Sequence, residues 1–154
     1  MTLVRSATIE DRAQLEGMHL AYLEALAQHD HPDWEPHELE DKWFTDRDRL
    51  FPYVVSDGDE VRGYMLVFGP KYSQAMGFEV NSYIHELFVC AELRGSGLAQ
   101  AALEHALQER PGTWVTEGLE SNGPASRFWA RSLAGRPGLR DEVRGAFRTY
   151  WFKS

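Results

Sequence analysis

The chain has almost no cysteine, no long apolar run and no excess of basic residues. Cys90 is the one cysteine among 154 residues, which excludes a disulfide within the chain. No apolar run approaches the roughly 20 residues that a helix needs to cross a bilayer. The net charge of -8 lacks the clustered lysine and arginine that nucleic-acid binding requires. These absences predict a protein that binds neither membranes nor nucleic acid and whose charge suits an amine partner.

The amino-terminal stretch MTLVRSATIEDRAQLEG also lacks the continuous apolar core of a signal peptide, because Arg5 interrupts it. Together with the lone cysteine, this predicts a cytoplasmic protein, since thiols stay reduced there. Hydrophobic residues make up 43% and charged residues 26% of the chain, as in soluble globular domains. We expect one domain over residues 1–154, long enough to bury a core.

Apolar periodicity and turn residues predict an α/β (α+β) fold with the order β-α-α-β-β-β-α-β-α-β-β. Thr8 and Asp11 form a capping-box pattern before the first helix, and Asp57-Gly58-Asp59 predicts a hairpin turn. The predicted helices run from Thr8 to about Gln28, near 36–45, over 97–110 and over 122–133. The predicted strands lie within 3–7, 50–69 (two strands), 79–91 and 112–118 and on both sides of Arg144-Gly145.

A small glycine-rich turn, Arg94-Gly95-Ser96-Gly97, runs directly into one of these helices. Loops of this kind hold phosphates in several unrelated folds. A Walker loop is excluded, because no lysine follows a glycine as that pattern requires. A dinucleotide-binding turn would explain Glu117 as a ribose-binding acid, but Gln100 stands where its third glycine belongs. The five-residue segment from Cys90 to Arg94 also separates strand from glycine, which disfavours that turn.

The stretch HELFVCAELRGSGLAQAAL resembles the central motif of the GNAT N-acetyltransferases, in which Arg/Gln-x-x-Gly-x-Gly/Ala begins a helix. Residues 94–99 match that pattern. The later stretch TWVTEGLESNGPASRFWARSL looks like a second motif of the family, carried here by Asn122, Ala125, Phe128 and Trp129. The resemblance covers nearly the whole chain and is nearest to a group of bacterial acetyltransferases. It implies a mixed, mostly antiparallel twisted sheet with a splayed parallel pair in its centre, flanked by about four helices.

The resemblance implies that acetyl-CoA is the cosubstrate. Backbone N–H groups at a helix start can converge on a pyrophosphate, and glycines let the backbone approach it closely. In the family, backbone groups of the preceding strand bond the pantetheine arm and can face the thioester oxygen. The residues implied to contact acetyl-CoA are Phe88, Val89, Arg94, Gly95, Ser96, Gly97, Leu98, Ala99, Asn122, Ser126 and Trp129. The alternative is a turn without a ligand, with Asn122 serving only to cap its helix.

Glu86 is a carboxylate set in the apolar strand YIHELFV. Strand alternation predicts that Ile84, Glu86 and Phe88 share one face, with His85 on the other. An alkyl amine is mostly charged at neutral pH, so its acetylation needs a base. Burial raises the pKa of a carboxyl group and makes it a better base, and the family places a glutamate here that serves as base in some members. The alternative is a structural carboxylate that pairs with an arginine or a backbone group.

Trp129 departs from the family pattern, because a tyrosine at this place often protonates the departing thiolate. An indole N–H cannot usefully give up its proton. The thiolate therefore leaves unaided, or another residue takes the tyrosine's place. Tyr83, His85 and Tyr150 are the candidates, and we take Tyr150 with Glu86 as the catalytic pair. Cys90 could suggest a covalent route, but no base is paired with it in the sequence, which favours an inert thiol.

Residues 30–41 are acidic and contain neither lysine nor arginine. We hypothesise that these acids, Asp30, Asp33, Glu35, Glu38, Glu40 and Asp41, attract a cationic acceptor; the alternative is a solvated helix face. The neighbouring histidines, His29, His31 and His37, match no zinc spacing, so we expect no metal. Aromatic residues nearby could wall an acceptor pocket or belong to the core: Trp34, Trp43 and Phe44.

Taken together, the sequence predicts an acetyl-CoA-dependent N-acetyltransferase. The acetyl group would pass to a primary amine of a small molecule or peptide by direct attack in a ternary complex. A non-catalytic acyl-CoA-binding or sensor domain is the alternative. The sequence leaves a homodimer open.

Overall fold

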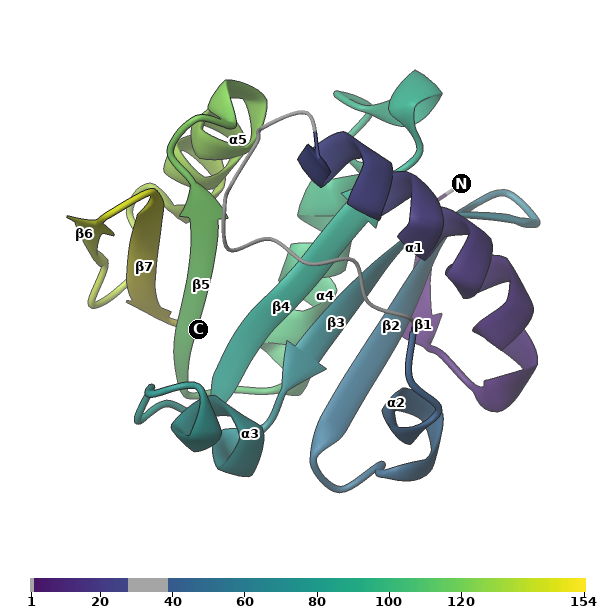
Figure 1. Cartoon of the computed structure of the whole chain (residues 1–154), viewed down its shortest axis with the longest axis horizontal. Coiled ribbons are helices and arrows are strands. Elements are labelled where there is room, and N and C mark those ends of the chain that lie inside the picture. The colour runs from purple at the N-terminus through teal and green to yellow at the C-terminus, as the bar shows by residue number, and fades with distance from the viewer. Residues whose placement is uncertain (1, 28–38) are drawn as a thin grey trace.

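The computed structural model describes residues 2–27 and 39–154, which form a seven-stranded sheet with helices on both faces (Figure 1). The strands are β1 (Thr2–Ser6), β2 (Leu50–Asp57), β3 (Glu60–Phe68), β4 (Ser82–Val89), β5 (Thr113–Leu119), β6 (Arg140–Arg144) and β7 (Phe147–Lys153). The helices are α1 (Arg12–Ala27), α2 (Lys42–Thr45), α3 (Pro70–Ala75), α4 (Leu98–Glu109) and α5 (Gly123–Leu133), with short 3-10 turns at Ile9–Asp11 and Ala91–Leu93.

The sheet has the order β1-β2-β3-β4-β5-β7-β6. Its strands pair in antiparallel fashion except for β4 and β5, which are parallel and lie near the centre. This confirms the predicted mixed α/β fold with a central parallel pair. The predicted hairpin turns are also confirmed, because β2 ends at Asp57 and β6 ends at Arg144, each just before a glycine with positive φ.

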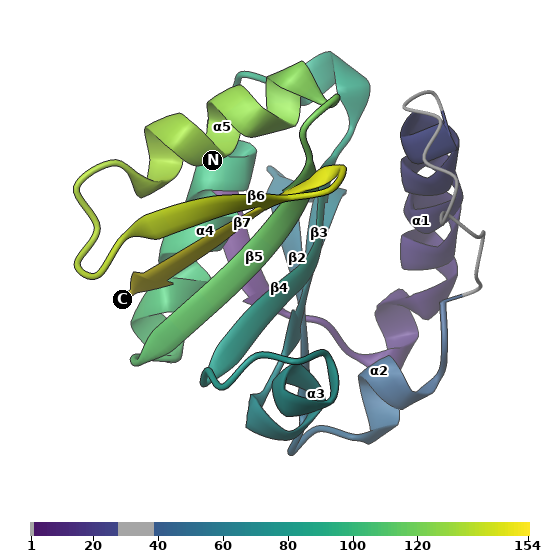
Figure 2. The same cartoon turned by 60° about the vertical axis from the view of Figure 1, so that its left-hand side comes forward.

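The helices divide the molecule into two apolar cores, one on each face of the sheet. Figure 2 shows α1 and α2 on one face and α4 and α5 on the other. The α1-side core is built from Ala7, Leu15, Met18, Leu39, Trp43, Phe44, Leu50, Val54, Tyr64, Leu66, Phe68, Tyr83, Phe88 and Val115. The α4-side core is built from Tyr53, Val55, Met65, Val67, Ile84, Val89, Leu98, Ala102, Leu103, Ala106, Leu107, Trp114, Trp129, Leu133, Tyr150 and Phe152.

To the roughly four helices that were predicted, the structure adds a short fifth one, α3, in the described part of the chain. Its six residues are too few to show a helical period in the sequence. Pro70 begins it, and the hydroxyl of Ser73 donates to the Gly69 carbonyl at 2.8 Å. The helix predicted near 36–45 is shorter than expected within the described residues: α2 begins at Lys42, and 36–38 lie outside the described ranges.

A β-bulge in β4 changes which residues share a face. Leu66 pairs with Glu86 but the next residue of β3, Val67, pairs with Ile84, so His85 is the extra residue. The bulge shifts the alternation by one position. Ile84 therefore faces the α4-side core, whereas His85 and Glu86 both face α1 and α2. The prediction that Ile84 shares a face with Glu86 is wrong for this reason.

The two parallel strands separate soon after they meet. Ser82, Tyr83 and Ile84 pair with Trp114, Val115 and Thr116, and no pairing between β4 and β5 follows. The Thr116 hydroxyl donates to the Ile84 carbonyl at 3.3 Å, at the last pair. Figure 1 shows β4 and β5 together at this end and apart at the other. The splay predicted from the family resemblance is confirmed.

Gly63 of β3 lies close against the backbone of β4, which yields a stability prediction. A Cβ at Gly63 would lie 2.5 Å from the Phe88 carbonyl oxygen, whereas one at Gly17 of α1 would meet nothing within 4 Å. We expect Gly63→Ala to lower the free energy of unfolding by about 1–3 kcal/mol because it overpacks the β3–β4 contact. Gly17→Ala should raise it by about 0.5–1 kcal/mol, since alanine favours the helix. Urea unfolding measures both; equal effects would contradict the proposed crowding.

Candidate active site

Glu86 lies on β4 in a buried hydrogen-bonded cluster with α1 and β3. Its side chain is 3% exposed, and His19 of α1 is 1% exposed. Oε2 of Glu86 accepts from the Tyr64 hydroxyl at 2.9 Å and lies 3.1 Å from Nδ1 of His19. Nε2 of His85 lies 3.7 Å from the other carboxylate oxygen. The described partners of this carboxylate thus include a hydroxyl and two imidazoles.

The tyrosines beside Glu86 are held in their neutral form. Burial, strengthened by the charge of Glu86, raises the pKa of Tyr64 well above its usual 10. The same two causes raise the pKa of Tyr22, which packs edge-on against the Tyr64 ring. Tyr64 therefore remains a hydrogen-bond donor to Glu86 at any physiological pH.

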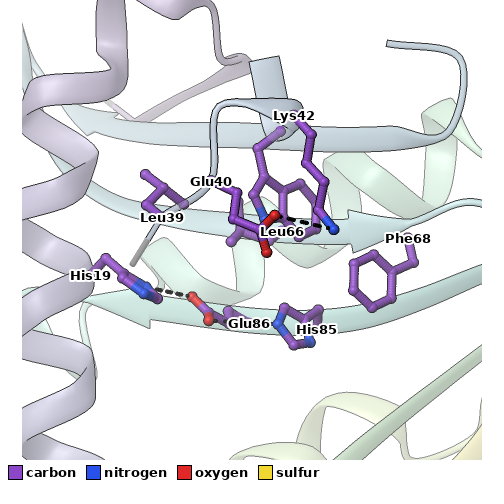
Figure 3. A pocket seen from close by; sticks show the side chains of 9 residues that line it. His19, Leu39, Glu40, Lys42, Leu66, Phe68, His85 and Glu86 are labelled. Atoms are coloured by element: carbon purple, nitrogen blue, oxygen red, sulfur yellow. Dashed lines mark hydrogen bonds and ion pairs between the residues drawn. The ribbon is translucent and has the colours of Figure 1, made fainter. Parts of the chain in front are cut away.

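A small pocket opens beside this cluster, between α1, α2 and the strands β3 and β4 (Figure 3). Its lining combines charged, aromatic and apolar side chains: His19, Leu39, Glu40, Lys42, Trp43, Leu66, Phe68, His85 and Glu86. The His85 ring stacks on Phe68 at 4.7 Å and on Trp43 at 6.0 Å between ring centroids. Glu86 thus borders a pocket large enough for a small polar group and walled by aromatic rings.

The acceptor residues predicted around 30–41 are only partly described. Asp30, Asp33, Glu35, Glu38, His29, His31, His37 and Trp34 lie outside the described residues. Within them, Glu40 lines the pocket and lies 3.4 Å from Lys42, while Asp41 pairs with Arg12. Trp43 both lines the pocket and belongs to the α1-side core, and Phe44 belongs to that core.

The glycine turn precedes α4 with the backbone conformation that only glycine adopts easily. Gly95 and Gly97 have φ angles of 86° and 94°, and a Cβ on either would enter open space. No side chain caps α4, and the N–H groups of Gly97, Leu98 and Ala99 have no partner among the described residues. Such unpaired donors at a helix start, next to open space, fit a pyrophosphate.

Two side chains of the turn hold it in place. Nε of Arg94 donates to the Val89 carbonyl at 3.2 Å, and its guanidinium lies 5.8 Å from the centroid of the Phe88 ring. The Ser96 hydroxyl bonds the Leu93 carbonyl. Leu98 is buried in the α4-side core. These contacts fix the turn to the end of β4 without engaging the N–H groups of Gly97, Leu98 and Ala99.

Phe88 and Val89 end β4 on opposite faces of the sheet, in the α1-side and α4-side cores. Both pair with β3, through Tyr64 and Gly63. Toward β5, β4 has no described strand partner beyond Ile84. That edge is where a pantetheine arm could bond the backbone, as a further strand would.

The residues of the second motif, at and along α5, make mainly structural contacts. Asn122 caps α5, since its Oδ1 accepts from the Ala125 N–H at 3.2 Å. Ser126 is half-buried in the first turns of α5. Trp129 is buried in the α4-side core, and its indole lies against Gly118 of β5.

The predicted catalytic pair is not brought together. Tyr150 lies on β7 in the α4-side core, with Trp129, whereas Glu86 faces α1. Of the other candidates, His85 adjoins Glu86, and Tyr83 donates to Glu117 at 3.2 Å. Cys90 is partly buried, and burial raises the pKa of its thiol.

Sequence reasoning missed His19, Tyr64 and the contacts of Glu117. His19 stands four residues after Leu15 on the apolar stripe of α1, and this position was a signal of burial. Tyr64 was hidden in the apolar run of a hairpin strand. The described residues hold no cluster of histidine, cysteine and acidic side chains that could bind a metal, and none of their helices is long and apolar enough to span a bilayer.

Comparison with known proteins shows the family to which this chain belongs. Residues 15–134 match the Acetyltransferase (GNAT) family. The fold is similar to a GNAT acetyltransferase from Streptococcus agalactiae, with TM-score 0.72 and 15% identity over 99% of this chain and 95% of that one. It is also similar to the ribosomal-protein-S18-alanine N-acetyltransferase of Escherichia coli, with TM-score 0.59 and 14% identity over 99% and 94%.

A further similar structure is a Bacillus anthracis acetyltransferase solved in complex with acetyl coenzyme A. Its TM-score is 0.62 at 11% identity, over 99% of this chain and 96% of that chain. A sequence search of curated proteins finds no match. The structural similarities are all at low sequence identity and show the fold alone. The family match covers most of the chain and shows the family.

The buried tyrosines predict how the protein responds to alkaline pH. Because their pKa values are raised in the folded state, Tyr22, Tyr64 and Tyr83 ionise only when the chain unfolds. Stability from these groups is present below pH 10 and is lost as the pH rises above it, since the unfolded phenols then ionise. At pH 10.5, absorbance at 295 nm should report fewer ionised tyrosines in the native protein than in urea. Equal numbers would contradict their burial.

The glycine turn predicts separate effects on stability and on ligand binding. Gly97 and Gly135 share a positive φ and open space, but only Gly97 belongs to the turn before α4. Alanine at either position should cost about 1–2 kcal/mol of unfolding free energy. Gly97→Ala should also raise the Kd for acetyl-CoA roughly tenfold, measured by titration calorimetry. An equal loss of affinity in Gly135→Ala would point to strain alone.

Proposed function

Because this chain belongs to the GNAT family of acetyltransferases, we propose that it transfers the acetyl group of acetyl-CoA to a primary amine. The amine is carried by a small molecule or a peptide and attacks directly in a ternary complex. The proposal treats residues 1–154 as one acetyltransferase domain. A cytoplasmic location and a homodimer stay predictions.

The environment of Glu86 is the observation that supports this proposal best. A carboxylate 3% exposed borders a pocket between α1, α2 and the sheet. It stands two residues beyond Ile84, where β4 and β5 separate. A base placed here can reach an amine that enters from the α1 face. Its described neighbours include an imidazole on each side and the Tyr64 hydroxyl, which orient the carboxylate.

Acetyl-CoA supplies the thioester whose carbonyl carbon the amine nitrogen attacks. The backbone donors of Gly97, Leu98 and Ala99 hold its pyrophosphate at the start of α4. The remaining contacts come from Gly95, from Ser96 and from the edge of β4 near Phe88 and Val89, where β5 offers no strand partner. Arg94 braces this loop through the Val89 carbonyl. Asn122, Ser126 and Trp129 act through the position of α5.

Glu86 takes one proton from the acceptor's ammonium group, directly or through a water molecule. The new C–N bond forms as the C–S bond breaks, and the nitrogen's second proton ends on the CoA thiol. His19 and Tyr64 orient the carboxylate, because each contacts Oε2. They act as positioning residues, and His19 also lines the pocket that Glu86 borders.

A dedicated proton donor for the thiolate is not needed in this scheme. A thiol has a pKa near 8.5, so its anion is a tolerable leaving group. Tyr83 is engaged with Glu117, and Trp129 and Tyr150 are buried in the α4-side core. A proton-donating role of Tyr150 stays a prediction.

Replacement of Glu86 by glutamine tests the proposal. We expect Glu86→Gln to lower kcat for an acetylated amine by about 100- to 10,000-fold, because the amide cannot accept the proton. The Kd for acetyl-CoA should change little. Steady-state CoA release with a panel of amines gives kcat, and calorimetry gives Kd.

Glu109→Gln is the matched control, because Glu109 of α4 also bonds a tyrosine and a histidine, Tyr53 and His105, but lies away from the pocket. Its kcat should stay near that of the wild type. If the wild type binds acetyl-CoA and acetylates no amine, a non-catalytic acyl-CoA-binding domain replaces the enzyme. An unchanged kcat in Glu86→Gln would remove Glu86 as the base.

A further inference from the structure

Glu117 stands at the point where the central strands separate. The last paired residues are Ile84 and Thr116, so the next residues along the two strands are His85 and Glu117. Val115, two residues before Glu117, belongs to the α1-side core, and alternation places Glu117 on that same face. His85 faces the same way. The opening of the sheet is thus bordered by His85 on β4 and by the carboxylate of Glu117 on β5.

Two hydroxyl groups from the neighbouring strands hold the Glu117 carboxylate. Tyr83 of β4 donates to Oε1 at 3.2 Å, and Thr149 of β7 donates to Oε2 at 3.1 Å. Burial, with the nearby charge of Glu117, raises the pKa of Tyr83 well above its usual value, so its phenol stays a neutral donor. Each carboxylate oxygen of Glu117 is thus oriented by a neutral hydroxyl group.

The charge of Glu117 has no cationic partner among the residues that the structure describes. Arg148, next to Thr149 on β7, pairs with Glu120 and Asp141. Lys42 pairs with Glu40 and lies over the Tyr72 ring. Glu117 is half-buried, so an acceptor entering on this face would take water from an uncompensated carboxylate. That step is unfavourable for a neutral group and favourable for a cation.

We propose that Glu117 binds a second ammonium group of the acceptor, one that stays protonated, so that the acceptor is an aliphatic diamine or a longer polyamine. The inference rests on the proposed acetyl transfer: Glu86 takes the proton of the reacting amine, and Glu117 holds the amine that does not react. Both carboxylates face α1, from the two strands that separate. The net charge of -8 favours the approach of such a cation.

The test compares amines of equal carbon number with one or two amino groups: putrescine against butylamine, and cadaverine against pentylamine. The wild type should prefer the diamine of each pair. Glu117→Gln should raise KM for the diamines by roughly 10- to 100-fold, as expected for loss of a charge-assisted hydrogen bond, with kcat little changed. KM for the monoamines should stay constant. Glu117→Asp, which keeps the charge, should retain the preference for diamines.

A merely structural Glu117 would affect monoamines and diamines alike, so an equal loss in Glu117→Gln would overturn the proposal. An unchanged diamine KM would overturn it as well. The control variant is Glu109→Gln, whose carboxylate has two described partners but lies on α4. It should keep the wild-type ratio of the two KM values.

Direct binding separates this proposal from the proposed function. Calorimetry with putrescine and CoA present needs no transfer, and Glu117→Gln should raise the Kd for putrescine by the same factor of roughly 10 to 100. If putrescine binds through Glu117 but neither it nor any amine of the panel is acetylated, the transferase proposal fails and the ammonium site stands. If monoamines are acetylated and putrescine gains nothing from Glu117, the ammonium site fails and the transferase stands.

Discussion

The separation of β4 from β5 is the constraint on which the rest of the structure depends. The strands share pairing only over Ser82–Ile84 and 114–116, after which each keeps its outer neighbour, β3 or β7. The two strands can therefore separate while β4 keeps its hydrogen bonds to β3 and β5 keeps its hydrogen bonds to β7. Opening leaves backbone groups on the inner edges without strand partners, and such groups are costly unless water or a ligand bonds them. An extended ligand that lies between the strands restores those bonds, which explains why a fold would maintain a gap at its centre.

The bulge at His85 makes the two faces of the sheet differ where β4 and β5 separate. Without it, strand alternation would turn either His85 or Glu86 toward the α4-side core. With it, both face α1, while Ile84 and Val89 remain in the α4-side core. The α4 side contributes a rigid support: Leu98 is buried there and anchors the helix whose first N–H groups are unpaired. The proposed donor loop thus depends on apolar packing, whereas the proposed acceptor face depends on the bulge.

Local motifs made much of this fold predictable, and long-range contacts account for most of what was missed. The glycine turn and both hairpin turns follow from short patterns whose physical causes are local, such as positive φ at glycine, whereas the central parallel pair was expected from the family resemblance. The bulge cannot be read from YIHELFV, because it depends on how Leu66 and Val67 align with that strand. His19 lies 67 residues from Glu86, so its position on an apolar helix face predicted burial but no partner. The sequence suggested a role for Glu117 only as the ribose-binding acid of a dinucleotide-binding fold. The observed fold excludes that role.

The chemistry of the acidic face depends on the kind of partner each carboxylate has. An arginine beside Glu86 would lower the pKa of the carboxyl group and make it a poorer base. Its contacts among the described residues include the Tyr64 hydroxyl and two imidazoles, which orient the carboxylate. Glu117 likewise has hydroxyl partners, but it is half-buried and lies on the opposite strand. The two carboxylates on this face can therefore have different roles. The buried Glu86 removes a proton from the reacting amine, and the more open Glu117 binds an ammonium group that stays charged.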